Sequence, residues 1–241
     1  FICSLNLYRN INKKHMNYPG KELENFERAY IWRKYIYFLI KKYLKDNILE
    51  VGAGIGSFTK NYIKYFKSIQ LTETDHNNYL KLKERFRDND LLIENKFTNE
   101  INKKFNCIMY LNVLEHIKED TNEINDALNL ISSKGNLIIL VPAHNSLYGK
   151  FDQAIGHHKR YEMDYFENLS LNNASIKKLI FLDSMGYFLY YLNKIFFKEE
   201  VYPSKTKVFI WDKIFTPISI ILDKLSNYKF GKSILCIIEK N

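Results

Sequence analysis

The strongest constraint on the fold is a short apolar run that ends in three glycines at alternate positions, ILEVGAGIGS at residues 48–57. Glycine permits a tight backbone turn and lets main-chain N–H groups approach a ligand where a Cβ would collide. The spacing is GxGxG, whereas a dinucleotide fingerprint, GxGxxG, would place its third glycine at Ser57. A plain tight turn is the alternative. The position of Gly52, Gly54 and Gly56 directly after a buried strand, with Glu50 before them, favours a ligand-binding turn.

Apolar runs and amphipathic segments alternate regularly on both sides of this turn. Strands are expected at residues 47–51, 69–72, 91–94, 107–111 and 137–141. Helices are expected from near Gly56, over residues 79–86, and from Asp120, where Glu123 three residues on resembles a capping box. Such alternation is typical of βαβ units, which build a parallel sheet with helices on both faces. Ligands of such sheets bind at the edge where the carboxyl ends of the strands meet.

Beyond Pro142 this regular alternation stops. A loop-rich stretch is expected up to Tyr161, followed by a short helix, a strand at 176–182, two aromatic-rich helical segments and a last strand at 234–238. An amphipathic helix is expected over residues 21–45. The length of 241 residues suits one elaborated domain. We therefore expect an N-terminal helical cap (1–46), a cofactor-binding core (47–142), and a substrate-shaping region with the closing strands (143–241).

Carboxylates follow the second and third predicted strands. A carboxylate at the end of the second strand can accept hydrogen bonds from two ribose hydroxyls. Glu73 is the first choice for this role, and Asp75 is the alternate, although Asp75 could instead cap the following helix. Glu94, followed by Asn95, ends the third strand, where it could meet an adenine amine.

The composition of the chain limits the classes of partner that we expect it to bind. The chain is 46% hydrophobic and 15% aromatic, which excludes global disorder, and no uncharged run approaches the roughly 18 apolar residues of a transmembrane helix. Cys3, Cys107 and Cys236 are far apart, so a reducing, cytoplasmic compartment is the simpler expectation. The net charge of +9 suggests attraction to anions, but the lysines are scattered and a solvated surface explains them as well. No RNA-binding motif is present, so a nucleic-acid partner is not expected.

Further segments extend the pattern: LTETD at 71–75, NCIMYLNVLEHIKED at 106–120 and GNLIILVPA at 135–143. In this order after the glycine turn, they resemble the class I S-adenosylmethionine-dependent methyltransferases, within the group of LEH-containing methyltransferase domains. LYGKFDQAIGHHKRY at 147–161 is similar to a block of many bacterial, envelope-associated members, and FGKSILCIIEK at 230–240 resembles their closing strand. The resemblance spans about residues 22 to 241.

The resemblance implies a Rossmann-like α/β fold and a cofactor. The sheet would have seven strands, mostly parallel with the last antiparallel, and S-adenosylmethionine would bind at its edge. Glu50, Gly52 and Gly54 would hold the methionine end, Glu73 the ribose, and Asn112 with Val113 the floor beneath the sulfonium. The predicted cofactor-binding residues are Glu50, Gly52, Gly54, Gly56, Glu73, Asp75, Glu94, Asn112 and Val113.

Two departures from the family pattern concern acids. The acid common at the start of the fourth strand is Asn106 here, which weakens any role for a carboxylate at that point. In some relatives an ExxEH motif binds a metal, but its first acid is Asn112 in this chain. Glu115 and His116 alone are too few ligands, so no metal site is expected. The pair is expected instead to form hydrogen bonds at a helix start.

Candidate catalytic residues lie in the block from Tyr148 to Tyr161. Methyl transfer is an in-line displacement that needs a base only when the acceptor is an alcohol, phenol or ammonium. His157 is the preferred catalytic or substrate-orienting residue, since a neutral histidine can take a proton near pH 7. Arg160 could grip a carboxylate or phosphate, with Tyr161 as its neighbour and Asp152 as a further candidate. A polar loop without a catalytic role is the alternative.

The acceptor is expected to be a small molecule or a glycan, with polysaccharide or lipid-linked sugar preferred because the GHHKRY block is frequent among envelope-associated enzymes. The aromatic segments at 187–192 and 195–197 suit core packing, or alternatively a platform for a lipid-linked acceptor or the membrane interface. Two other classes share the glycine turn and the ribose acid. These are an NAD(P)-dependent oxidoreductase and a non-catalytic scaffold with a cofactor fold.

Overall fold

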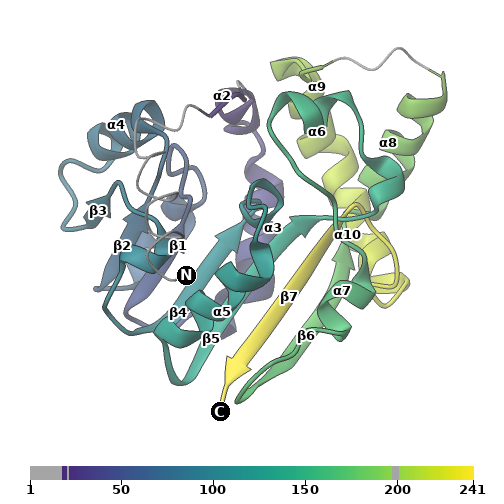
Figure 1. Ribbon diagram of the computed structural model, residues 1–241. Coiled ribbons are helices and arrows are strands. Elements are labelled where there is room, and N and C mark those ends of the chain that lie inside the picture. Colours follow the sequence, from purple (N-terminus) through teal and green to yellow (C-terminus); the bar gives the residue numbers. More distant parts are fainter. Residues whose placement is uncertain (1–17, 21, 197–200) are drawn as a thin grey trace.

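The computed structural model describes residues 18–20, 22–196 and 201–241 of the chain, with the side chains of 192–196 left out. One seven-stranded sheet runs through it in the order β3-β2-β1-β4-β5-β7-β6 (Figure 1). The strands are β1 (Ile48–Val51), β2 (Ile69–Thr72), β3 (Leu92–Glu94), β4 (Phe105–Leu111), β5 (Ile131–Pro142), β6 (Ala174–Leu182) and β7 (Ser233–Lys240). β7 lies antiparallel between β5 and β6, and the remaining pairs are parallel. The predicted Rossmann-like sheet with an antiparallel last strand is confirmed.

Helices cover both faces of the sheet (Figure 1). They are α2 (Leu23–Phe26), α3 (Tyr30–Ile40), α4 (His76–Arg85), α5 (Asp120–Leu130), α6 (Lys150–Ala154), α7 (Met163–Glu167), α8 (Ser184–Phe196), α9 (Lys205–Ile210) and α10 (Thr216–Leu225). One apolar cluster joins the sheet to α5 and α7, and a second joins it to α3, α4 and α10. The central strands β1 and β2 are buried along their whole length because both faces are covered.

The chain changes direction across the sheet between β1 and β4. From β1 it moves outward to β2 and β3, and it then returns to β4 on the other side of β1. The connections that leave β1 and β4 therefore diverge, and a crevice forms where their carboxyl ends meet. The glycine turn follows β1, and Asn112 with Val113 follows β4, so both segments flank this crevice.

The helix expected over residues 21–45 is broken in the structure, and that prediction was wrong in its continuity. Ala29 has a non-helical conformation (φ −77°, ψ 63°), which separates α2 from α3. The guanidinium of Arg33 donates to the main-chain oxygens of Phe26 (2.8 Å) and Glu27 (2.6 Å), so it satisfies the end of α2. No glycine or proline in the sequence marks the break. The contacts that stabilise it form only when the chain is folded, so the sequence pattern does not reveal them.

The helix expected from Gly56 is also absent, and two 3₁₀ turns replace it at Thr59–Asn61 and Ile63–Tyr65. The hydroxyls of Thr59 (2.7 Å) and Tyr62 (2.6 Å) both donate to Oε2 of Glu50. Residues three apart face the same side of a 3₁₀ turn, which lets both hydroxyls reach one buried carboxylate. The buried acid of β1 therefore fixes this local geometry.

α5 begins at Asp120 as predicted, but its expected capping box does not form. Glu119 is the N-cap and makes no side-chain capping bond. Asp120 accepts instead from the hydroxyl of Tyr161 (2.6 Å), and Glu123 accepts from the hydroxyl of Tyr110 (2.8 Å). Two tyrosines that lie elsewhere in the sequence have taken the carboxylates that local spacing assigned to the cap.

The region after Pro142 completes the same sheet through β6 and β7 and adds α6 to α10, of which α7 lies beside β6 (Figure 1). A π-helical turn, Trp211–Phe215, joins α9 to α10. In the part of the chain described, no helix is both long and apolar enough to cross a bilayer. Cys107 and Cys236 are free thiols in the core, and Cys3 lies outside the described residues.

Candidate active site

The three glycines of the turn after β1 all adopt positive φ angles, 64° at Gly52, 58° at Gly54 and 75° at Gly56. An L-residue rarely adopts this conformation, so the turn depends on glycine. A Cβ on Gly52 would also lie 2.8 Å from the side chain of Val113, which follows β4. The turn and the segment after β4 therefore approach each other more closely than a side chain at position 52 would allow.

Glu73 points into this turn from the end of β2. Its Oε2 accepts the main-chain N–H of Gly54 at 2.8 Å, and its Oε1 accepts the N–H of Asp75 at 2.8 Å. The side chain is 8% exposed, and burial raises the pKa of Glu73 although the two main-chain bonds oppose the rise. Carboxylate oxygens have further lone pairs, so Glu73 can still accept from hydroxyls of a ligand.

Asp75 caps α4, which was the alternative for this residue in the sequence. Its Oδ1 accepts the N–H of Asn78 at 2.8 Å, and its Oδ2 accepts the N–H of Tyr18 at 2.7 Å. Both carboxylate oxygens therefore have main-chain partners. A role for Asp75 toward a cofactor stays a prediction.

Glu94 and Asn95 leave β3 beside the same loop. Oε2 of Glu94 accepts the side-chain amide of Gln70 at 2.7 Å, and its Oε1 pairs with Lys96. The side chain of Asn95 donates to the main-chain oxygen of Glu73 at 2.7 Å. Asn95 therefore positions the backbone of Glu73. Contact of Glu94 with an adenine stays a prediction.

Glu50 lies beneath the glycine turn, 3% exposed, with its Oε2 bonded to the hydroxyls of Thr59 and Tyr62. Burial raises the pKa of Glu50 to about 7, against the effect of these two bonds. In this structure Glu50 supports the segment after the turn. Direct contact with a methionine moiety stays a prediction.

Asn112 and Val113 form the opposite side of the crevice. Asn112 has a positive φ of 57° and donates its main-chain N–H to the oxygen of Leu140 at 2.8 Å. This hydrogen bond to β5 directs the chain toward the glycine turn. The side chain of Val113 there occupies the space that a Cβ on Gly52 would need. Their role as the floor beneath a sulfonium stays a prediction.

The segment before α3 crosses the same edge of the sheet. Tyr18 is bonded to Asp75, and the side chain of Leu23 lies 3.6 Å from where a Cβ on Gly54 would be. The sequence pattern did not predict these contacts, because a helix expected over residues 21–45 does not say where that helix lies relative to the glycine turn. The N-terminal cap therefore covers part of the crevice.

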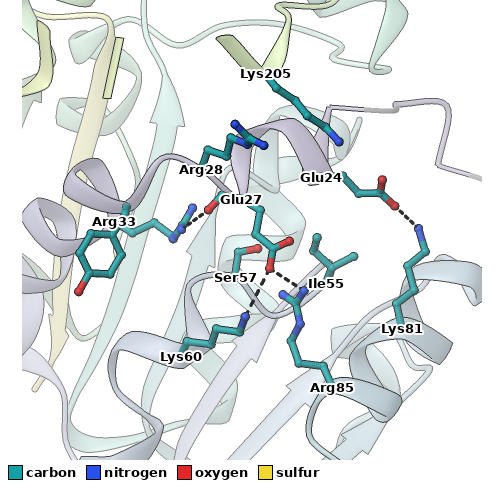
Figure 2. Close-up of a pocket in the computed structure, with 11 residues that line it drawn as sticks. Glu24, Glu27, Arg28, Arg33, Ile55, Ser57, Lys60, Lys81, Arg85 and Lys205 are labelled. Atoms are coloured by element: carbon teal, nitrogen blue, oxygen red, sulfur yellow. Dashed lines mark hydrogen bonds and ion pairs between the residues drawn. The ribbon is translucent and has the colours of Figure 1, made fainter. Parts of the chain in front are cut away.

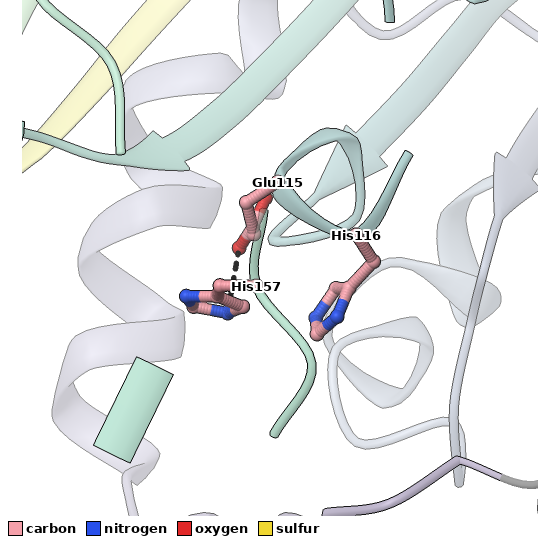
Figure 3. Close-up of side chains that lie close together, drawn as sticks. All are labelled: Glu115, His116 and His157. Atoms are coloured by element: carbon pink, nitrogen blue, oxygen red, sulfur yellow. Dashed lines mark ion pairs between the residues drawn. The ribbon is translucent and has the colours of Figure 1, made fainter. Parts of the chain in front are cut away.

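His157 lies between the carboxylates of Glu115, drawn in Figure 3, and of Asp152. Its Nδ1 is 2.7 Å from Oδ1 of Asp152, and its Nε2 is 3.7 Å from Oε1 of Glu115. The ring of His116 meets the ring of His157 edge-on, with centroids 4.6 Å apart. Glu115 is fully buried, and neither of its carboxylate oxygens has a hydrogen-bond partner in the described structure. The expected hydrogen-bonded pair of Glu115 and His116 is therefore wrong.

Burial and charge set the protonation of this cluster. Burial raises the pKa of Glu115 to about 7, although the nearby His157 opposes the rise. Burial, with a smaller contribution from His157, lowers the pKa of His116 to about 4, so this imidazole is neutral at pH 7. Burial would also raise the pKa of Asp152, but hydrogen bonds from His157 and Arg160 and the charge of Arg160 hold it below its usual range.

Arg160 joins His157 on the same carboxylate, whereas Tyr161 lies apart from them. Nε of Arg160 donates to Oδ1 of Asp152 at 3.0 Å, and the guanidinium lies 4.6 Å above the ring of Tyr190. Tyr161 is 1% exposed in the apolar core, where its hydroxyl donates to Asp120 and burial raises its pKa. The structure therefore brings together two of the three predicted catalytic residues. All three roles stay predictions.

Comparison with known proteins decides what kind of crevice this is. A family model described as a methyltransferase domain matches residues 23–179, more than half of the chain. The chain belongs to the methyltransferase domain family. No curated protein matches the sequence of this methyltransferase.

Solved methyltransferases share the fold of this methyltransferase at low sequence identity. The N-methyltransferase NodS from Bradyrhizobium japonicum, solved with S-adenosylhomocysteine, is 10% identical with a TM-score of 0.56, covering 90% of this chain and 87% of NodS. An S-adenosylmethionine-dependent methyltransferase from Clostridium acetobutylicum is 14% identical, with a TM-score of 0.56 and coverages of 88% and 92%. Coclaurine N-methyltransferase, bound to N-methylheliamine and S-adenosylhomocysteine, is 11% identical, with a TM-score of 0.59 and coverages of 88% and 72%.

The crevice of this methyltransferase fits the cofactor of its family, S-adenosylmethionine. The glycine turn has no side chain at position 52, where a Cβ would collide with Val113, and the carboxylate of Glu73 faces that turn. The cofactor supplies an electrophilic methyl group on a sulfonium. The family assignment thus replaces the NAD(P)-dependent oxidoreductase alternative.

The same edge of the methyltransferase holds a donor set suited to a divalent metal ion (Figure 3). Glu115, His116 and His157 can each offer one ligand atom, and these atoms lie within 4.8 Å of one another. Two imidazoles and a carboxylate match the donors of many metal sites, and Asp152 on Nδ1 of His157 matches the usual outer support of a histidine ligand. From the sequence we expected too few ligands because only Glu115 and His116 were counted. The third ligand type, His157, comes from a distant segment that the fold brings close.

Proposed function

We propose that this methyltransferase methylates a hydroxyl oxygen of a small-molecule or glycan-type acceptor, with polysaccharide or lipid-linked sugar preferred. The observation that carries the proposal is the short bond between Nδ1 of His157 and the buried carboxylate of Asp152. An alcohol needs a base as it attacks a sulfonium methyl group, whereas a free amine does not. A histidine held by a carboxylate supplies such a base.

The chemistry follows from the orientation of His157. Asp152 stays ionised and accepts a hydrogen bond from Nδ1–H of His157. The unprotonated Nε2 is then the basic nitrogen. His157 would take the acceptor's O–H proton at Nε2 as the oxygen receives the methyl group. S-adenosylmethionine would supply that group from its sulfonium, with the bonding electrons left on sulfur, and would leave as S-adenosylhomocysteine. Arg160 donates to the same oxygen of Asp152 and helps to hold it in place.

A metal-assisted form of this reaction is the second candidate, because both oxygens of buried Glu115 lack hydrogen-bond partners in the described structure. Glu115, His116 and His157 would hold the ion. A divalent cation supplies Lewis acidity, which lowers the pKa of a bound hydroxyl and replaces the need for a free base. In this form His157 is a ligand and not the base.

Radiolabelled methyl transfer to a panel of sugars, polysaccharides, lipid-linked sugars and amines tests the proposal. The assay is run with chelator, and again after adding back Mg²⁺, Mn²⁺ or Zn²⁺. With His157 as base, transfer to hydroxyls persists in chelator, His157→Asn loses about 100-fold or more in kcat, and His116→Asn loses far less. In the metal-assisted form, chelator and both variants abolish transfer.

Two results would overturn O-methylation. Transfer confined to amines, with His157→Asn unaffected, would make the acceptor nitrogen, as in NodS and coclaurine N-methyltransferase, which are named N-methyltransferases. Binding of S-adenosylhomocysteine without transfer to any acceptor class would favour the non-catalytic scaffold.

The finer assignments belong to the same proposal. Residues 47–142 hold the cofactor, and residues 143–241 shape the acceptor side under the cap of residues 1–46. The exposed rings of Phe188 and Tyr191 on α8 support contact with a lipid-linked acceptor or a membrane surface. The buried free thiols of Cys107 and Cys236 agree with a cytoplasmic location. The GHHKRY block supports membership of the LEH-containing, envelope-associated group.

A further inference from the structure

A cavity of about 640 Å³ opens beside the glycine turn, between α2, the start of α3, α4 and α9 (Figure 2). Six of its lining residues are cationic: Arg28, Arg33, Lys60, Lys81, Arg85 and Lys205. Glu24 and Glu27 are its two acids. Leu23, on the same short helix, lies against Gly54. The cavity therefore adjoins the cofactor crevice, and Ile55 and Ser57 of the glycine turn also line it.

The cavity carries an excess of four positive charges, since six cations face two carboxylates. The whole chain has a net charge of +9, so nearly half of that excess is concentrated around one hollow. Neighbouring cations repel one another, and this repulsion is relieved when an anion binds between them. The scattered-lysine explanation of the net charge does not account for this local concentration.

The two acids are already engaged by some of the cations. Oε1 of Glu27 pairs with Arg85 at 2.6 Å and with Lys60 at 3.4 Å, and Glu24 pairs with Lys81 at 2.8 Å (Figure 2). These pairs hold α2 against α4 and the segment after the glycine turn. Among the described residues, Arg28, Arg33 and Lys205 form no such close side-chain pair with either acid.

Two polar groups of the lining are buried and have no partner within the described structure, Nη1 of Arg85 and Oγ of Ser57. Arg28 and Lys205 are exposed at the rim of the cavity. Arg33 lies beside them, and its guanidinium donates to the main-chain oxygens of Phe26 and Glu27. Buried donors without acceptors are costly, so a ligand that supplies acceptors would bind favourably.

We propose that this cavity binds the phosphate group of a phosphomonoester or diphosphate ligand. Phosphate offers several acceptor oxygens on one small anion, and guanidinium groups bind it in a bidentate manner. Ammonium and hydroxyl donors complete such a site, as Lys205 and Ser57 do here. An excess of four charges suits a diphosphate better than a single carboxylate. The proposal does not depend on which acceptor is methylated.

The test is isothermal titration calorimetry of the full chain with pyrophosphate in phosphate-free buffer. The pocket variant is Arg28→Glu/Lys205→Glu, and the matched control is Lys224→Glu/Lys229→Glu, which changes the net charge equally at residues outside the lining. We expect pyrophosphate to bind the wild type, with Kd raised at least about 10-fold in the pocket variant and less than about 2-fold in the control. Retained binding of S-adenosylhomocysteine by both variants shows that they are folded.

Further titrations identify the source of the phosphate. Tighter binding of a soluble sugar phosphate assigns the site to a free metabolite, and tighter binding of a diphosphate lipid in detergent micelles assigns it to a lipid-linked ligand. Three results overturn the proposal. The first is no pyrophosphate binding by the wild type up to 10 mM, which corresponds to roughly 3 kcal/mol of binding free energy, and the second is equal weakening of pyrophosphate binding in both variants. The third is an oligonucleotide that binds the wild type more tightly than pyrophosphate and no longer binds the pocket variant.

Discussion

At the scale of single residues, three acids of the sheet edge are held in surroundings that favour their protonated forms. Glu50, Glu73 and Glu115 are each buried, and burial is the largest cause of the raised pKa of each. Each has a different set of partners: two hydroxyls, two main-chain N–H groups, and no hydrogen-bond donor in the described structure. Three acids with similar burial therefore differ in how many of their carboxylate lone pairs the described structure already uses.

The pH dependence of stability tests the assignment of Glu50. Its pKa is raised to about 7 when folded, against about 4.5 when unfolded, so the folded state binds more protons between these values. Its contribution to stability is full below pH 4.5 and is lost as pH rises through 7. The unfolding free energy of the wild type should therefore fall by on the order of 2 to 3 kcal/mol between pH 5 and 8, and this fall should be absent in Glu50→Gln. Urea unfolding at both pH values measures it, and an unchanged slope would contradict the assignment.

The close approach of Gly52 to Val113 gives a second residue-scale prediction. Gly52→Ala adds a Cβ 2.8 Å from the Val113 side chain at a φ of 64°. We expect a loss of about 2 kcal/mol in unfolding free energy from both effects. Adding Val113→Ala should cost less on the Gly52→Ala background than on the wild type, because it relieves the collision. Strict additivity of the two changes in urea unfolding would mean that the two residues do not meet.

The glycines, Glu73 and the residues after β4 were predictable because each follows a strand of a regular βαβ pattern. The environment of His157 was not, because its partner Glu115 comes from another segment and only the fold joins them. The position of Tyr161 was not predictable either. Its position beside Arg160 in sequence suggested a shared site, whereas its ring packs on Phe166 in the core.

At the scale of elements, α3 begins where another helix supplies its cap. The buried carboxylate of Asp212 accepts the main-chain N–H groups of Ile31 at 3.0 Å and Trp32 at 2.8 Å. A carboxylate at a helix start satisfies free donors and complements the helix dipole. The break between α2 and α3 is therefore stabilised from the π-helical turn far along the chain.

Asp212→Ala should lower the free energy of unfolding by about 2 to 3 kcal/mol, since it leaves two main-chain donors without a charged acceptor. Asp90→Ala, at an exposed loop position, is the control and should change stability by less than about 0.5 kcal/mol. Urea unfolding followed by circular dichroism measures both. Equal losses for the two variants would show that Asp212 is not the cap of α3.

Most strands were predictable to within a few residues at their ends because apolar runs between polar turns leave few alternatives, but β5 begins at Ile131, six residues before its predicted start at Leu137. The helices were less so. Residues 21–45 keep helical periodicity across a break that Arg33 and Asp212 stabilise, and the segment after Gly56 is shaped by Glu50 beneath it. In both places a buried polar contact, which sequence spacing does not reveal, decides the backbone.

At the scale of the whole molecule, the reversal of strand order at β1 and β4 brings the functional segments together at one edge. The glycine turn, Glu73 and the His157 cluster all lie there, and the N-terminal cap crosses it. Leu23 of α2 lies against Gly54 and Glu24 of α2 lines the cationic cavity, so one short helix contacts both places where we expect ligands. The pairing of a cofactor crevice with a phosphate site would suit an acceptor that carries phosphate.

Calorimetric titration of S-adenosylhomocysteine into the folded protein tests the central claim, that the glycine turn and Glu73 form the cofactor site. The wild type should bind one equivalent and give no heat with NADH. Glu73→Ala should weaken binding at least about 10-fold through loss of two ribose hydrogen bonds, while Glu84→Ala, exposed on α4, should not. No heat from S-adenosylhomocysteine, or equal affinity in Glu73→Ala and the wild type, would contradict it.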